Sequence, residues 1–134
     1  MRDNVFATTT FTDPGNVWRS DNIEVVVDAD GSAGQYDSAA ATAQQYILNP
    51  GAFPNPVLFT LGLTDPPEAT GAVTLTPQED GSFTYQYELA LPGWNLIDDS
   101  GNGSRHDFAP GQIVGLALGF ADFESAAAAA PEYH

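Results

Sequence analysis

Apolar and polar residues alternate along much of this chain, and a period of two residues is typical of β-strands with one buried face. The alternation is clearest in residues 83–91, where one face would carry Phe83, Tyr85, Tyr87, Leu89 and Leu91. Residues 22–28 show it too, with Ile23, Val25 and Val27 predicted to face a core. Further strands are expected at residues 43–49, 57–63, 72–76 and 112–121, with a less regular β-prone segment at 4–11.

Residues 112–121 are predicted to form a fully buried strand. One face would carry Val114, Leu116, Leu118 and Phe120, and the other would carry only Gly115, Ala117 and Gly119. Small residues keep a sheet face thin, so another sheet or a ligand can approach it closely. Between two of the other strands, Asp80-Gly81 predicts a hairpin, because glycine adopts the positive φ that such turns need.

Short strands separated by turns rich in glycine, proline and aspartate predict an all-β fold. No long amphipathic helix is expected; residues 38–43 are compatible with one helical turn, and the alanines at 126–130 with either a short helix or a tail. About seven strands spaced in this way are typical of an antiparallel β-sandwich. We therefore expect one jelly-roll-like domain over residues 1–134, with residues 126–134 as its tail.

The chain is strongly acidic, with 18 acidic residues, three basic residues and a formal net charge of -15. Nucleic acid and anionic lipid surfaces are therefore not expected as partners, because both require a basic surface. The longest apolar stretch, Ile113 to Ala121, is far shorter than the ~20 residues that span a membrane. Cysteine is absent, which excludes disulfides. A neutral ligand or a cation fits this charge, and an extracellular or salty setting would screen it.

Four segments in order resemble family 9 carbohydrate-binding modules and their DOMON-like relatives. The segment from Trp18 to Gly31 is similar to the family's "W..D.vE...D.d" stretch, and the segment from Gln44 to Asn49 to its next strand. The segment from Tyr85 to Trp94 resembles its "Y..E..IPW" strand, and the segment from Gly111 to Asp122 its "G..IGF....D" strand. The resemblance implies a jelly-roll sandwich, a non-catalytic extracellular role and often bound calcium.

The chain departs from the family pattern at both ends. Family members have one or two strands before the tryptophan segment and another after the last segment, so flanking strands are expected to be lacking here. Relatives also clamp a sugar between two aromatic rings. Trp18 and Glu24 match the first half of that site by position, and Tyr133 is the nearest candidate for the second ring. Gln44 or Gln45 replaces the basic residue that the family pattern has on the following strand.

Trp18, Glu24, Gln45 and Trp94 form the candidate ligand-binding set. An indole stacks on the apolar face of a pyranose, and a carboxylate accepts strong hydrogen bonds from sugar hydroxyls. The alternatives stay open: Trp18 as a core or sheet-edge residue, and Glu24 and Gln45 as solvated surface. For Trp94 the family pattern implies a plug over the end of the sandwich.

The acidic turn from Asp28 to Ser32 is a candidate calcium site, built from Asp28 and Asp30 and closed by Asp37. Calcium takes roughly six to eight oxygen ligands, and carboxylates that alternate around a glycine bend can supply some of them. Residues 98–102, with Asp107 near in sequence, form a second candidate. The alternative for both is an ordinary hydrophilic loop.

These features favour a non-catalytic carbohydrate-binding module that binds neutral poly- or oligosaccharide outside the cell or at its surface. The alternative is a structural or adhesive subunit of an extracellular assembly, completed by strand addition from a neighbouring chain. It rests on the expected lack of flanking strands, since open sheet edges allow self-association. An enzyme is not expected. The sequence places no pair of carboxylates in a cleft, as a glycosidase needs, and Ser104, His106 and Asp107 lie too close along one loop to form a triad.

Overall fold

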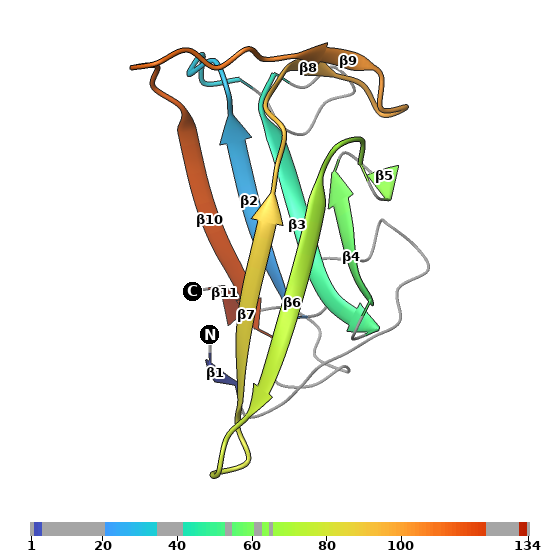
Figure 1. Ribbon diagram of the computed structural model, residues 1–134, viewed down its shortest axis with the longest axis vertical. Coiled ribbons are helices and arrows are strands. Elements are labelled where there is room, and N and C mark those ends of the chain that lie inside the picture. Colours follow the sequence, from blue (N-terminus) through green and yellow to red (C-terminus); the bar gives the residue numbers. More distant parts are fainter. Residues whose placement is uncertain are drawn as a thin grey trace.

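The computed structural model describes residues 2–3, 21–34, 42–52, 55–60, 63–64, 66–122 and 132–133, and every regular element in these ranges is a β-strand (Figure 1). The strands are β1 (Arg2–Asp3), β2 (Asn22–Asp28), β3 (Gln44–Ala52), β4 (Asn55–Thr60), β5 (Leu63–Thr64), β6 (Thr70–Pro77), β7 (Phe83–Ala90), β8 (Trp94–Ile97), β9 (Gly103–Arg105), β10 (Gly115–Asp122) and β11 (Glu132–Tyr133). The all-β prediction is confirmed. The described part of the chain contains no helix that is long and apolar enough to cross a membrane.

The strands of the described ranges form three sheets in which every pair is antiparallel, as predicted. The largest sheet has six strands in the order β11-β10-β2-β3-β4-β5, the second has the order β1-β7-β6, and the third is β8-β9. The jelly-roll topology and the single domain over residues 1–134 stay predictions. Residues 4–11, 38–41 and 123–131 lie outside the described residues, whereas residues 132–133 of the expected tail form β11 on β10.

One apolar cluster joins the two larger sheets. Its buried members come from β2 and β3 on one side and from β6 and β7 on the other: Ile23, Val25, Val27, Tyr46, Leu48, Val73 and Tyr85. The inward positions predicted for residues 22–28 and 83–91 are confirmed, since Phe83, Tyr87, Leu89 and Leu91 pack against this cluster. Gly71 of β6 lies so close to β3 that a Cβ there would come within 2.8 Å of Leu48 Cδ1.

The hairpin between β6 and β7 turns at the predicted place. Gly81 has a φ of +83°, in the region that favours glycine. The Asp80 carboxylate accepts the backbone N–H of Ser82 at 3.2 Å and its hydroxyl at 2.6 Å. The aspartate therefore satisfies the backbone of the turn while the glycine supplies its conformation.

The prediction of a fully buried strand at residues 112–121 is wrong. The strand is β10, which begins at Gly115, and the predicted division into two faces is confirmed from Gly115 to Ala121. Leu116 and Leu118 lie opposite Val27 and Val25 of β2, so they point to the core side of the sheet. They are nevertheless 66% and 58% exposed. The reason is that the two sheets approach each other where β6 lies against β4, whereas β10 contacts mainly β2 and β11 (Figure 1).

Replacing Leu48 by alanine should destabilise the fold by about 2–5 kcal/mol, because this side chain is 1% exposed and its loss leaves a cavity between the sheets. Leu96→Ala is the matched control. Leu96 on β8 is 43% exposed, so its truncation should cost about 1 kcal/mol or less. Urea unfolding measures both values, and equal losses would contradict the packing described here.

Candidate functional site

The structure brings Glu24 and Gln45 together. They lie on neighbouring strands, and Gln45 Nε2 donates a hydrogen bond of 3.0 Å to Glu24 Oε2. Both side chains are partly buried and point away from the core. Trp18 and Asp37, which the sequence also indicated, lie outside the described residues.

The pairing of β10, β2 and β3 places small side chains beside Glu24 and Gln45 on this side of the sheet. Gly119 of β10 lies opposite Glu24, and Ala117 lies opposite Val26, which on its other side lies opposite Gln45. We call this surface of Glu24, Val26, Gln45, Ala117 and Gly119 the outer face. Because Gly119 and Ala117 carry at most a methyl group, neither side chain covers Glu24 from the β10 side. The thin face predicted for β10 therefore lies beside the predicted polar residues.

The outer face suits an uncharged ligand rich in hydroxyl groups. The Glu24 carboxylate is a strong acceptor, and the Gln45 amide carries both an acceptor and donors. Val26 adds apolar surface against which C–H groups can pack. The hydrogen bond between Glu24 and Gln45 orients both side chains in advance, which lowers the entropy lost when a ligand binds.

Trp94 is linked to the core side of the same sheet. Its backbone N–H donates to Gln44 Oε1 at 3.2 Å, and Gln44 Nε2 donates to its carbonyl at 3.4 Å. Gln44 lies opposite Val27 and therefore points toward the core, whereas Gln45 points outward. A ligand on the outer face thus does not reach the Trp94 indole.

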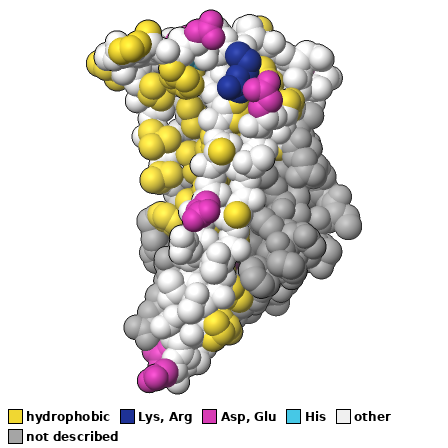
Figure 2. Space-filling model, viewed as in Figure 1, with side chains coloured by type: hydrophobic (Ala, Val, Ile, Leu, Met, Phe, Trp, Pro, Cys, Tyr) yellow, Lys and Arg dark blue, Asp and Glu magenta, His cyan; other side chains and the backbone are white. Residues whose placement is uncertain are grey.

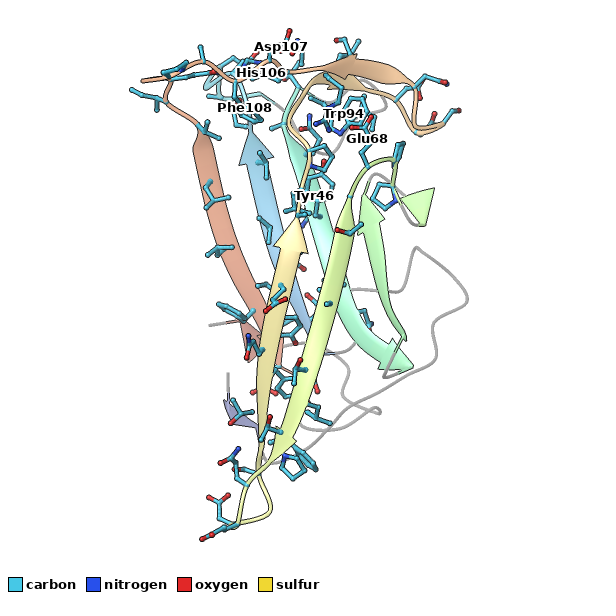
Figure 3. All side chains as sticks on the ribbon, viewed as in Figure 1. Tyr46, Glu68, Trp94, His106, Asp107 and Phe108 are labelled. Atoms are coloured by element: carbon cyan, nitrogen blue, oxygen red, sulfur yellow. The ribbon has the colours of Figure 1, made fainter. Side chains whose placement is uncertain are left out.

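The Trp94 ring is also covered. The residue is 5% exposed, and the Arg105 guanidinium carbon lies 5.0 Å from the centre of its ring. Arg105 in turn forms an ion pair of 3.4 Å with Glu68, which lies at the same end of the molecule (Figure 3). This position matches the alternative of a plug at the end of the core, and a sugar would reach the ring only if Arg105 moved.

Tyr46 anchors the segment that leads into Trp94. Its side chain is fully buried, and its hydroxyl donates a hydrogen bond of 3.0 Å to the carbonyl of Pro92 (Figure 3). Burial raises the pKa of Tyr46 to about 12. The hydroxyl is therefore a donor over the whole neutral range and holds Pro92 against β3.

The candidate calcium loop is closed by its own backbone. The Asp28 carboxylate accepts the N–H groups of Ser32 and Ala33 at 3.3 and 2.7 Å, and the Asp30 carboxylate accepts that of Ser32 at 3.0 Å. Hydrogen bonds from the side chain and backbone of Ser32 lower the pKa of Asp30. No group of three acidic, histidine or cysteine residues suited to a metal occurs among the described residues. Calcium binding by Asp28, Asp30 and Asp37 stays a prediction, because Asp37 lies outside the described residues.

The second candidate calcium turn has the same design. Asp98 Oδ1 accepts the backbone N–H groups of Ser100 and Asn102 at 2.9 and 2.8 Å. The Asn102 bond is the main reason that the pKa of Asp98 lies below its ordinary value. The carboxylate here shapes the turn between β8 and β9, as an aspartate at the start of a turn commonly does.

A polar cluster around His106 was not predicted. Its Nδ1 lies 2.7 Å from Asn95 Oδ1, and its Nε2 contacts Gln112 Nε2, which also donates to the Ala29 carbonyl at 2.8 Å. The Phe108 ring meets the imidazole edge-on, with ring centres 5.1 Å apart (Figure 3). This cluster ties the loop before β10 to the loop after β2. No local signal indicates it, because Gln112 and Ala29 are 83 positions apart.

A shallow depression, of about 340 Å³, lies on the β6–β7 hairpin and is lined by Thr70, Gly71, Ala72, Glu88, Leu89 and Ala90. Gln86 Nε2 donates to Glu88 Oε1 at 3.2 Å. This pair has the same chemistry as Glu24 and Gln45, but both residues are exposed and belong to one strand. Its hydrogen bond does not link two strands, and the pair serves below as a control.

Comparison of the chain with protein-family models, with curated proteins and with solved structures gave no significant match. The resemblance to family 9 carbohydrate-binding modules therefore stays a prediction from the four sequence segments.

We expect the free energy of unfolding to fall at alkaline pH because of the buried Tyr46 hydroxyl. Because its pKa is raised in the folded protein, the unfolded chain loses this proton first, and stability falls as the pH rises from about 10 to 12. A shift of two pKa units corresponds to roughly 2–3 kcal/mol. The Tyr46→Phe variant has no hydroxyl to titrate, so its stability lacks this pH-dependent contribution. The difference in unfolding free energy between wild type and variant should therefore narrow as the pH rises from about 10 to 12. Chemical denaturation at several alkaline pH values tests this, and identical pH dependences would contradict it.

Proposed function

We propose that this protein is a non-catalytic carbohydrate-binding module that binds neutral poly- or oligosaccharide on the outer face of its six-stranded sheet. The observation that carries the proposal is the hydrogen bond between Glu24 and Gln45 beside the small side chains of Ala117 and Gly119. This arrangement presents a charged acceptor and an amide next to a surface that a sugar ring can approach.

The net charge of -15 supports a neutral ligand. A phosphorylated or carboxylated glycan would meet repulsion from the whole chain and from Glu24 itself, whereas a neutral glycan would not. In this proposal the module acts outside the cell or at its surface, where salt screens the self-repulsion of the acidic surface.

The spacing of carboxylates supports a binding role rather than catalysis. Glycosidases cleave with two carboxyl groups roughly 5–10 Å apart. The next outward carboxylate on β2 is Asp28, and four residues along a strand span about 13 Å. Its oxygens also accept the N–H groups of Ser32 and Ala33. In the described parts of β2, β3 and β10, Glu24 therefore has no second carboxylate at catalytic distance.

The proposal predicts that Glu24→Ala weakens glycan binding about tenfold or more, since a hydrogen bond to a charged group contributes roughly 1.5–3 kcal/mol. Gln45→Ala should weaken it roughly two- to tenfold, since hydrogen bonds to a neutral amide contribute less. Glu88→Ala is the matched control, because it removes the same charge from the equivalent pair on the other sheet. Affinity electrophoresis on neutral polysaccharides, followed by calorimetry, measures the loss. Equal loss in the control, or no binding across the panel, would refute the site.

Trp18 serves in this proposal as the stacking platform. The chain has two tryptophans, so a Trp94→Phe variant leaves Trp18 as the only indole. A bound sugar should then quench or shift its fluorescence, because stacking removes water from the ring. Unchanged fluorescence in the presence of a glycan that binds by calorimetry would exclude Trp18 from the site.

A further inference from the structure

Among the described strands, β10 has only the short β11 as a partner on the edge that faces away from β2. β10 pairs with β2 from Gly115 to Ala121, and its other edge pairs with β11 only at Ala121 and Asp122. Among the described strands, none pairs with residues 115–120 on that side. An unpaired edge exposes a row of backbone N–H and C=O groups to which another strand can add.

Apolar side chains line this open edge. Leu116 and Leu118 point to the core side of the sheet and are 66% and 58% exposed, and Ile113 and Val114 before them are 83% and 40% exposed. Figure 2 shows hydrophobic side chains in a column along one margin of the molecule. Exposed leucines in a row are uncommon on a soluble domain and mark a contact surface.

The sequence of β10 up to Ala121 lacks the charges and prolines that usually protect an edge strand. Natural edges carry charges, prolines or bulges that prevent pairing with other chains. Residues 113–121 contain no charged residue and no proline, although the chain has 18 acidic residues and 10 prolines in all. The pairing with β2 is also regular along the whole strand. Two chains with a net charge of -15 can approach each other most closely where neither carries charge.

We propose that β10 pairs antiparallel with β10 of a second copy of this chain, about a two-fold axis perpendicular to the sheet. With the axis at Ala117, Leu116 lies opposite the partner's Leu118, and Leu118 opposite the partner's Leu116. All four leucines then lie on the core side, where cross-strand apolar pairs stabilise a sheet. Pairing extends from Val114 to Phe120 and ends where β11 occupies the edge. A two-fold axis makes the same strand serve on both copies, as in most homodimers.

This inference is independent of the glycan proposal, because it uses the open edge and the core side of β10 rather than the outer face. It gives the alternative of a self-associating structural subunit a definite surface. The glycan site remains exposed in the dimer, so two sites would share one continuous sheet and a polymeric glycan would bind with avidity.

Sedimentation equilibrium of the full chain tests the dimer. We expect a monomer–dimer equilibrium whose dissociation constant falls by tenfold or more between about 20 mM and 500 mM NaCl, because salt screens the repulsion between the two acidic chains. Leu118→Asp should weaken the dimer by tenfold or more without lowering the melting temperature of the monomer. Leu96→Asp makes the same change at an exposed leucine on β8 and should leave the dissociation constant of the dimer unaltered. A monomer at all concentrations and salts, or equal effects of both variants, overturns the proposal.

A single cysteine tests the register. The chain has no cysteine, and a residue on the two-fold axis lies opposite itself. Opposed Cα atoms in an antiparallel pair are roughly 4.5–5.5 Å apart, within the range that a disulfide bridges. Ala117→Cys should therefore form a covalent dimer under mild oxidation at least tenfold faster than Ala72→Cys, an exposed control on β6. Equal rates overturn the β10 pairing.

Discussion

The register in which β2 pairs with β3 and β10 is the constraint on which the rest of the structure depends. It places Val25, Tyr46 and Leu118 on one side of the sheet and Glu24, Gln45 and Gly119 on the other. A slip of one residue would turn the carboxylate into the core and the valines into water. Because burial of an unpaired charge is costly, Glu24, which we propose as a ligand-binding residue, also helps to hold the register.

The two larger sheets pack closely at β6 but not at β10, which explains why the apolar face of β10 is more exposed than those of the other long strands. Gly71 of β6 touches Leu48 of β3, and β6 lies against β4, so the core is closed on that side. On the opposite side β10 carries the same kind of apolar face with little to cover it. β10 thus has a side with small side chains next to Glu24, where we propose that a glycan binds. Its other side is apolar and lies at an edge, where we propose that a second copy of the chain pairs.

Sequence patterns predicted what depends on near neighbours. Alternation located the strands and their faces, and Asp80-Gly81 located a turn, because both are local properties of the backbone. The exposure of Leu116 and Leu118 was not predictable, since it depends on how far the other sheet extends. β8 and β9 were missed because they are short and do not alternate. Glu24, Gln45 and Trp94 were each named, but only the pairing register separates the first two from the third.

The most direct test of the central claim is nuclear magnetic resonance mapping of a neutral glycan on the isotope-labelled chain, kept dilute and at low salt so that it stays monomeric. The account predicts that the amide signals of Glu24, Val26, Gln45 and Gly119 shift together as glycan is added. Shifts confined to Trp94, Arg105 and their neighbours would contradict it, because those residues lie at the end of the core and not on the outer face.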